Sequence, residues 1–388
     1  MPRQPLRIIV VTAPMTGHFW PLVPLAWALR AAGHDVRVAS LPHIAGEVAA
    51  AGLPGLHVGP EADLMRLLQE TAEDPPDDPA NPFAHVRNLR GLVRWNARMA
   101  TLLIDGLMEP IRTERPDVIV HGGMEMAGPL LSGLLGVPAV KYPLGLPMRD
   151  NVVTGLRRGG AALRVRYGMP DRPGEPAMVL DVCPSGLRPG PEPSTLHRQP
   201  MRYLPYNGSG AIAEWAWEPQ VRRRVCVTNS VDPGDVIDVE PLLALAAAVA
   251  DDETEVVVPL PAHRLEGTHA PDGVRLVEWM PLHIAARSCA AVVHAGDPLS
   301  TFTFLSVGVP QLIRPAMSDE VRHGAAVEQA GAGRSVRADQ PLEASVRALR
   351  ELLADDDCRK RAEALAEEIR SLPSLIEVVA KIEALTAG

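Results

Sequence analysis

A strand–turn–helix–strand pattern at residues 288–315, SCAAVVHAGDPLSTFTFLSVGVPQLIRP, constrains the fold of this chain more than any other stretch. Ala290–Val293 is a short apolar run typical of a buried parallel strand. A polar turn then leads into a helix that we expect to start near Ser300 and to end at Gly308, before a second apolar run at 311–313. The pattern therefore predicts a βαβ unit in an α/β sheet.

The start of this helix is a candidate anion site. Ser300 and Thr301 place two hydroxyl groups there, after a turn that contains His294 and Gly296. The unpaired N–H groups and the dipole at a helix N-terminus both favour a phosphate. The alternative is an ordinary strand-to-helix turn whose hydroxyls only cap the helix.

The beginning of the chain has the same alternation. An apolar strand at Arg7–Thr12, a helix at Pro21–Ala32 and a second strand at Val36–Ser40 predict a βαβ unit. Its turn lacks the G-x-G-x-x-G pattern, which weakens a nicotinamide or flavin interpretation. His18 follows the first strand, where open α/β sheets bind ligands, and an imidazole there can act as a general base near neutral pH. Equally, His18 can simply cap the turn.

Glu125 follows another predicted strand, Asp117–Val120, and would orient His18 if both faced one cleft. The alternative is a surface carboxylate with no such role. Four apolar side chains near these turns are candidates for an acceptor pocket, with core packing as the alternative for each: Trp20, Met124, Met126 and Tyr142.

The second half of the chain restarts the alternation after a turn-rich break at 205–210. Trp279 follows a strand and could stack on a nucleobase or pack internally. Asp319 and Glu320 follow the strand at 311–313 and could accept hydrogen bonds from sugar hydroxyls or cap a helix. A chain of 388 residues is long for one core, so we expect two doubly wound halves with a cleft between them.

Composition excludes several classes of function. A formal charge of −9 argues against a nucleic-acid binder or a polybasic membrane binder. The four cysteines are scattered without C-x-x-C spacing, which disfavours a zinc site or a disulfide framework and fits a reducing cytoplasm. No segment approaches the roughly 20 apolar residues of a membrane helix. We expect a soluble cytoplasmic protein without a bound metal.

Several stretches together resemble the bacterial glycosyltransferases of the GT-B fold that decorate polyketides and related natural products. They span essentially the whole chain: APMTGHFWPLVPLAWALRAAGHDVRVAS, RPDVIV, RYLPYNG, RVCVTNS, VEWMPLHIAARSCAAVVHAG, GVPQLIRP and EQAGAGRSV. The resemblance implies an acceptor-binding domain at 1–210, a nucleotide-sugar domain at 220–371, and a final helix at 372–388 that returns to the first domain. It also implies metal-independent, inverting transfer of a sugar, often a dTDP-linked deoxysugar, to a hydrophobic small molecule, with no cofactor. The oligomeric state is left open, with a homodimer as one option.

The resemblance also assigns roles to particular residues. His18 matches the base that deprotonates the acceptor hydroxyl. Trp279 and Met280 match the nucleobase shelf, and Asp319 matches the acid that faces the donor sugar. Three further positions match residues on the phosphate side of the donor: Ser230, Ser300 and Thr301.

Three departures from the family pattern stand out. The family usually has His-His-Gly-Gly where this chain has His294-Ala295-Gly296-Asp297. Without a gap, Ala295 replaces the histidine that touches pyrophosphate, whereas a one-residue insertion would let His294 serve. Glu320 replaces the usual glutamine beside the acid, and Gly122 stands where the acid partner of the base is common, which leaves Glu125 as the substitute.

Two alternatives follow from these departures and from the family. The altered turn suggests a non-catalytic glycosyltransferase-like protein that supports a separate enzyme. Related enzymes also form carbon–carbon bonds to aromatic acceptors, and the same base could activate a phenol for either reaction.

Overall fold

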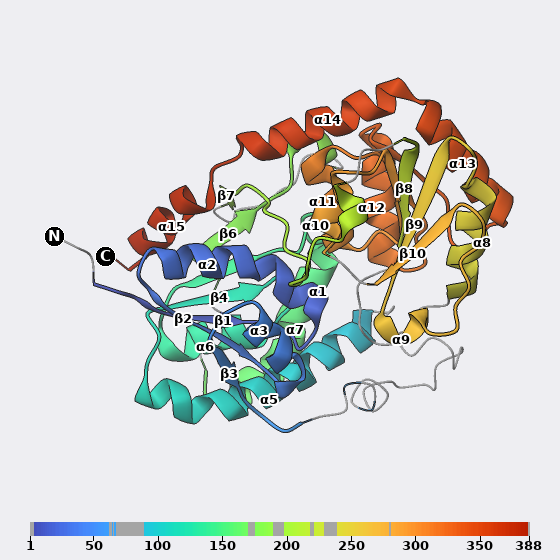
Figure 1. The fold of residues 1–388 in the computed structure, drawn as a ribbon. Helices are drawn as coiled ribbons and strands as arrows, with labels where there is room; N and C mark the ends of the chain where they lie inside the picture. Colours follow the sequence, from blue (N-terminus) through green and yellow to red (C-terminus); the bar gives the residue numbers. More distant parts are fainter. Residues whose placement is uncertain are drawn as a thin grey trace. The chain divides into compact units, whose positions relative to one another are not determined.

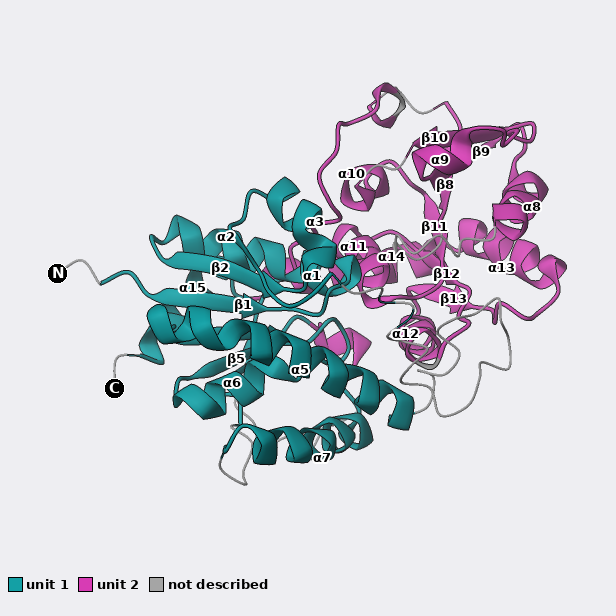
Figure 2. Ribbon diagram, turned by 90° about the horizontal axis from the view of Figure 1, so that it is seen from below, with its two compact units in different colours: residues 1–182, 193–202, 373–388 teal, residues 183–192, 203–372 magenta. Residues whose placement is uncertain are grey.

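The computed structural model describes residues 4–61, 64, 66, 89–169, 175–188, 198–217, 221–228, 239–278 and 281–386. The chain divides into two compact units (Figure 2). Unit 1 consists of Met1–Val182, Pro193–Arg202 and Pro373–Gly388, and unit 2 of Cys183–Glu192 and Tyr203–Leu372. The segment 70–82, which is acidic and rich in proline, lies outside the described residues.

Unit 1 contains a parallel sheet of seven strands in the order β3-β2-β1-β4-β5-β6-β7 (Figure 1). The strands are β1 (Arg7–Val11), β2 (Asp35–Ser40), β3 (Gly55–His57), β4 (Val118–Gly122), β5 (Ala139–Tyr142), β6 (Met178–Asp181) and β7 (Arg198–Pro200). The order runs outward in both directions from the β1–β4 pair. This is the doubly wound arrangement, in which ligands bind at the carboxyl ends of the strands where the order reverses.

Helices cover both faces of this sheet. They are α1 (Thr16–Phe19), η1 (Trp20–Leu22), α2 (Val23–Ala31), η2 (Pro42–Ile44), α3 (Ala45–Ala50), α5 (Leu89–Thr113), α6 (Ala127–Leu135), α7 (Asp150–Arg166) and α15 (Leu375–Ala384). The helices α5, α6 and α7 lie on one face and α2 on the other (Figures 1 and 2). The apolar stripe of α5 buries Leu103 and Leu107 against Ile9 and Ile119 of the sheet.

Unit 2 repeats the design with six parallel strands in the order β10-β9-β8-β11-β12-β13. The strands are β8 (Arg223–Val227), β9 (Thr254–Leu260), β10 (Val274–Glu278), β11 (Ala291–His294), β12 (Gln311–Ile313) and β13 (Gly333–Ser335). The helices are η4 (Ser185–Leu187), η5 (Glu214–Ala216), α8 (Val239–Val249), α9 (Ala262–Leu265), α10 (Leu282–Ala286), α11 (Pro298–Val307), α12 (Ser318–Gln329), α13 (Leu342–Ala354) and α14 (Asp356–Ser371). The predicted unit at 288–315 is therefore β11–α11–β12.

The helix α11 begins two residues earlier than the hydroxyl at Ser300 indicated. Asp297 is its N-cap, and its carboxylate accepts a hydrogen bond from Ser300 N at 2.9 Å. Pro298 occupies the first helical position, where its fixed φ suits a helix and its missing N–H costs nothing. The predicted end of the helix is confirmed, because Gly308 closes it with a left-handed φ of 77°.

The segment 203–210 belongs to unit 2, although its Pro and Gly content suggested a break that ends the first half of the chain. Tyr203 and Asn207 are buried there and bond to α11. Asn207 Nδ2 donates to Thr303 Oγ1 at 3.1 Å, and Tyr203 Oη donates to Leu299 O at 3.4 Å. At the other end of the chain, α15 packs on α2, and His34 Nε2 lies 3.1 Å from Glu383 Oε1.

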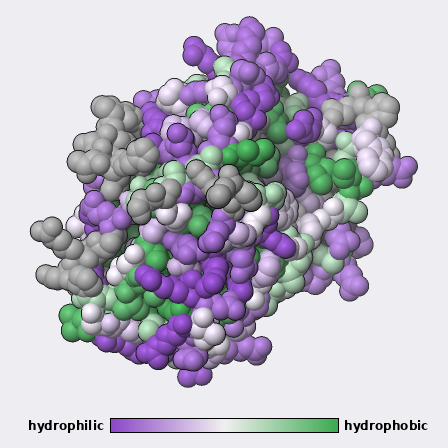
Figure 3. All heavy atoms as spheres, turned by 90° about the vertical axis from the view of Figure 1, so that its left-hand side faces the viewer, coloured by the Kyte–Doolittle hydropathy of each residue, from purple (hydrophilic) through white to green (hydrophobic). Residues whose placement is uncertain are grey.

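Polar side chains predominate on the face drawn in Figure 3, and hydrophobic ones form small separate groups. Within the described ranges, every helix is too short or too polar to cross a bilayer.

Candidate functional site

His18 lies in the short helix α1, the first element after β1. The strand ends at Val11, α1 spans Thr16–Phe19, and the side chain of His18 in α1 is half-buried. Its backbone N–H donates to Met15 O at 3.1 Å, which fixes the first turn of α1. Because β1 pairs with both β2 and β4, this turn lies at the point where the strand order reverses.

Glu125 lies in the turn after β4, the strand next to β1. Its carboxylate is buried and accepts hydrogen bonds from Ala127 N and from Gly128 N, the latter at 2.6 Å. Burial raises the pKa of Glu125 to about 7, against the lowering effect of these N–H donors. The side chain therefore satisfies the first N–H groups of α6 and caps the start of that helix.

The candidate acceptor residues lie mostly inside unit 1. Trp20, Met126 and Tyr142 are buried, and the indole N–H of Trp20 donates to Glu47 Oε2 at 3.2 Å. Met124 is half-buried, so it has more surface to offer a ligand than the other three.

His294 is the last residue of β11 and is buried. Its Nε2 donates to Gln311 Oε1 at 2.8 Å, and its Nδ1 accepts from Gly296 N at 3.0 Å. The ring also stacks on Phe304, with the ring centroids 5.7 Å apart. Burial lowers the pKa of His294. Both ring nitrogens are thus used within unit 2, and the next side chain along the turn is the methyl group of Ala295.

Asp297 is the residue of this turn that the sequence interpretation missed. Besides its bond to Ser300 N, its backbone carbonyl accepts from Thr301 N at 3.0 Å and from Thr301 Oγ1 at 2.8 Å. Ser300 and Thr301 are fully buried. An aspartate directly before a proline is a helix-start signal that could have revealed this cap. A carboxylate of the chain itself therefore occupies the N-terminus of α11.

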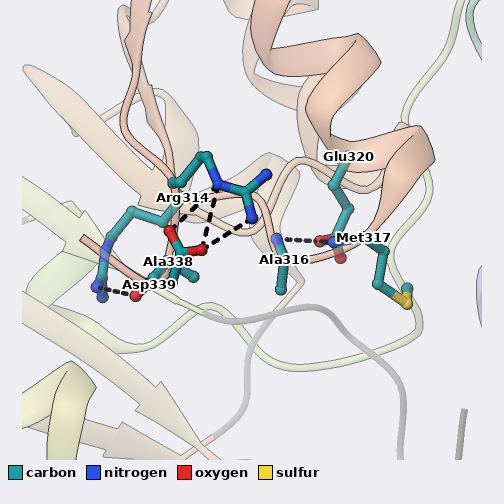
Figure 4. A network of polar contacts seen from close by, with 7 residues as sticks. Arg314, Ala316, Met317, Glu320, Ala338 and Asp339 are labelled. Atoms are coloured by element: carbon teal, nitrogen blue, oxygen red, sulfur yellow. Dashed lines mark hydrogen bonds and ion pairs between the residues drawn. The ribbon is translucent and has the colours of Figure 1, made fainter. Parts of the chain in front are cut away.

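Two more acids, Asp319 and Glu320, lie in the first turn of α12, and Figure 4 shows Glu320 with its backbone donors. Glu320 is buried, and its Oε2 accepts from Ala316 N and Met317 N, both at 2.8 Å. Burial is the main reason that the pKa of Glu320 rises to about 7, and the charges of Asp319 and Asp297 add to it. Asp319 is exposed, so it is the acid of the pair that can reach a ligand.

Three of the candidate donor residues lie outside the described residues: Ser230, Trp279 and Met280. The structure brings His294, Gly296, Ser300, Thr301 and Glu320 together with Asp297 around the start of α11, through the bonds above and through the close approach of Gly296 to Glu320.

Two family models match the chain: the N-terminal domain of the erythromycin biosynthesis protein CIII-like proteins at residues 27–230, and their C-terminal domain at 243–385. The chain belongs to this family. A similar protein is the L-demethylnoviosyl transferase of Streptomyces niveus, 33% identical over 95% of this chain and 99% of that protein. Another is the 3-alpha-mycarosylerythronolide B desosaminyl transferase of Saccharopolyspora erythraea, 29% identical over 99% of each.

Solved structures agree with the family. The glycosyltransferase SnogD of Streptomyces nogalater has a TM-score of 0.80 and 30% identity, over 99% of this chain and 100% of that one. SsfS6 of Streptomyces sp. SF2575, complexed with thymidine diphosphate, has a TM-score of 0.83 and 28% identity, over 98% and 99%. The chain is a glycosyltransferase with the GT-B fold, which confirms the fold, the family and the enzyme class expected from the sequence.

Proposed function

We propose that the chain transfers a deoxysugar from a dTDP-linked donor to a hydrophobic acceptor of polyketide type, with inversion at the anomeric carbon. Relatives named for transfer of desosamine and mycarose to macrolide aglycones support the sugar and acceptor classes. Thymidine diphosphate in the structures of SsfS6 and of the spinosyn rhamnosyltransferase SpnG supports the donor, and SpnG has also been solved with spinosyn aglycone.

The observation that carries the proposal is the place of His18 directly after β1, beside β4, where the strand order reverses. In the proposed reaction, the imidazole takes the proton of the acceptor hydroxyl. The oxygen then bonds to the anomeric carbon from the face opposite the leaving group, while the bond to the diphosphate oxygen breaks and its electron pair leaves with the diphosphate. One displacement inverts the configuration, and the proton remains on His18.

The supporting residues take different roles in this proposal. Asp319, exposed at the start of α12, would accept hydrogen bonds from the sugar. Trp279 and Met280 would contact the nucleobase of the donor. The buried residues would act by fixing the donor-side turns: His294, Gly296, Ser300, Thr301 and Glu320. On the acceptor side, Glu125 would position the start of α6, and Met124 would contact the acceptor more directly than Trp20, Met126 or Tyr142.

A transfer assay tests this function. Purified protein is incubated with a panel of dTDP-deoxysugars and macrolide or aromatic aglycones, and the glycosylated product is followed by mass spectrometry together with release of dTDP. We expect His18→Ala to reduce kcat by about 10²- to 10⁴-fold, which is the usual contribution of a general base. The matched control is His269→Ala, because His269 is exposed in a loop of unit 2.

Undiminished turnover in His18→Ala would remove His18 from the role of base. Failure of every donor to yield product, with the protein folded, would refute the proposed donor class. Acid hydrolysis of the product distinguishes an oxygen-linked sugar, which is released, from a carbon-linked sugar, which is retained.

A further inference from the structure

Unit 1 contains a cavity of about 90 Å³ between the ends of β4 and β5 and the helices α6 and α7. Apolar side chains form much of its wall: Met126, Leu130, Val153 and Leu156. The charged groups in the wall are mostly cationic, since Lys141, Arg157 and Arg164 line it and Glu125 is the acid among the lining residues. The cavity is thus apolar on one side and positively charged on the other.

Lys141 and His121 stand side by side in the floor of this cavity. They are register partners on the neighbouring parallel strands β5 and β4, so their side chains project to the same face of the sheet. Lysine is unusual in a strand whose other residues, Ala139, Val140 and Tyr142, are all buried. That single cation in an apolar strand was the sequence signal for this site.

The charge of Lys141 is not balanced by the described residues. The pKa of Lys141 is lowered to about 8, chiefly by burial and to a smaller extent by the nearby charges of Arg157 and Arg198. Arg157 is paired with Glu175 at 3.1 Å and Arg198 lies 3.8 Å from Asp181, whereas no carboxylate within the described ranges forms an ion pair with Lys141. Glu125 already accepts the N–H groups of α6. A largely buried ammonium without a counter-charge is costly, and a bound anion would offset that cost.

Two buried nitrogen atoms in the cavity wall also lack hydrogen-bond partners among the described residues: His121 Nε2 and Arg164 Nε. They have opposite requirements. Arg164 Nε–H is a donor, like the ammonium of Lys141. His121 Nδ1 must donate to Gly122 O, 2.9 Å away, because a carbonyl only accepts. Burial, with a smaller effect of Lys141, lowers the pKa of His121 to about 3, so the ring is neutral and its Nε2 is an acceptor.

We propose that this cavity binds an oxyanion that carries a neighbouring hydroxyl group, as found at the acidic end of an aromatic hydroxy acid. Lys141 and Arg164 donate to the anion, His121 Nε2 accepts from the hydroxyl, and the apolar wall contacts the carbon skeleton. The source of this group is either a free small acid or the acidic end of the acceptor. Its identification with the acceptor rests on the proposed function, whereas the binding itself does not.

Isothermal titration calorimetry without any donor tests the binding. The probes are salicylate and 3-hydroxybenzoate, compared with benzoate, which lacks the hydroxyl, and 3-hydroxybenzamide, which lacks the charge. We expect at least one hydroxybenzoate to bind. We expect loss of the charge to weaken binding about tenfold or more, and loss of the hydroxyl to weaken it several-fold.

Two variants assign the binding to this cavity. Lys141→Met should weaken hydroxybenzoate binding about tenfold or more. Its melting temperature should not fall, because no carboxylate of the described residues pairs with the lost ammonium. Arg164→Gln provides a second measurement if Lys141→Met does not fold. Arg158→Met is the matched control, since Arg158 is exposed on the same helix and does not line the cavity. Absence of binding to both hydroxybenzoates, or equal affinities in wild type and Lys141→Met, would overturn the proposal.

A last arm distinguishes the two sources. Tighter binding of 3-hydroxy-2-naphthoate than of the hydroxybenzoates supports an acidic group on a larger acceptor. Binding of the smaller acids alone supports a free hydroxy acid. Binding of acetate as tight as that of the hydroxybenzoates would refute the requirement for a hydroxyl. A protein that binds the hydroxy acids but transfers no sugar would separate failure of the proposed function from failure of this site.

Discussion

The turn after β4 in unit 1 and the turn after β11 in unit 2 stand at the same place in their sheets. Each follows the strand that pairs with the first strand of its unit, β1 or β8, where the strand order reverses. Each strand carries a buried histidine near its end, His121 or His294, followed two residues later by a glycine. Each helix then ends at a glycine of positive φ before Val-Pro and the next strand. The two halves therefore share one local frame.

The side chains in the two turns differ in charge and in which of their polar atoms lack hydrogen-bond partners among the described residues. Among the described residues, His121 Nε2 has no hydrogen-bond partner and lies beside a cationic cavity. His294 instead uses both ring nitrogens and lies near Asp297, whose charge also acts on Glu320. Both helix N-termini accept an acid from the chain itself, Glu125 in unit 1 and Asp297 in unit 2. A shared turn geometry thus does not fix the charge of the ligand. The unit with the proposed donor site has the more acidic turn.

The largest effect expected from this comparison concerns the acid of unit 1. The folded protein raises the pKa of Glu125 from 4.5 to about 7, so it binds this proton more tightly than the unfolded chain does. The contribution of Glu125 to stability is therefore fully present below about pH 4.5 and is lost as the pH rises through 7, by up to about 3 kcal/mol.

Urea unfolding gives the free energies of unfolding of wild type and of Glu125→Gln at pH 4.5 and at pH 7.5. The difference between the two proteins at each pH is then compared, and the change in that difference measures the loss. The control is Glu109→Gln, which removes an exposed carboxylate from α5. A constant difference for Glu125→Gln would show that the lowering effect of its N–H donors balances the raising effect of its burial.

A second test concerns the close approach of α6 to β4. Gly128 stands seven residues after His121, and Thr301 stands seven residues after His294. A Cβ atom at Gly128 would lie 2.4 Å from His121 Cβ, so the helix must move to admit it. We expect Gly128→Ala to lower the free energy of unfolding by about 1–3 kcal/mol.

The matched control is Gly46→Ala in α3, where no atom lies within 4 Å of the new methyl group. This change should stabilise the protein by about 0.5–1 kcal/mol, because it removes backbone freedom from a helix. Both values come from denaturant unfolding. Equal effects of the two substitutions would mean that α6 can shift away from β4 without cost.

The smallest of the three effects concerns the acid of unit 2. A diphosphate at the start of α11, as the proposed function requires, would approach the carboxylate of Asp297. Asp297→Asn keeps an oxygen that can accept from Ser300 N but removes the charge, so dTDP should bind about tenfold more tightly.

Calorimetry with dTDP and with thymidine separates the phosphate contribution, because thymidine affinity should not change. Asp356→Asn removes the same charge from an exposed position in the first turn of α14 and serves as the control. Unchanged or weaker dTDP binding in Asp297→Asn would mean that the diphosphate does not approach this carboxylate.

Most of the fold could be predicted from the sequence, because both halves alternate short apolar runs with helices. The turn at β11 was harder. The position of His294 at the strand end was evident, but its burial depends on Gln311 and Phe304, which reach it only after folding. Ser300 and Thr301 resemble exposed hydroxyls in sequence, yet helix packing covers both. Lys141 was overlooked because its importance depends on its burial and on the lack of an ion pair with any carboxylate of the described residues, which a linear sequence does not reveal.

The chain passes between its two units four times, after residues 182, 192, 202 and 372. This path matters for recombining halves of related glycosyltransferases. A chimera joined at residue 210 would take residues 203–210 from one parent and α11 from the other, and so would mix the partners of the Asn207–Thr303 hydrogen bond. A better chimera follows the two units. One parent supplies unit 1, which is residues 1–182, 193–202 and 373–388, and the other supplies unit 2, which is residues 183–192 and 203–372. Asn207 and Thr303 then come from the same parent.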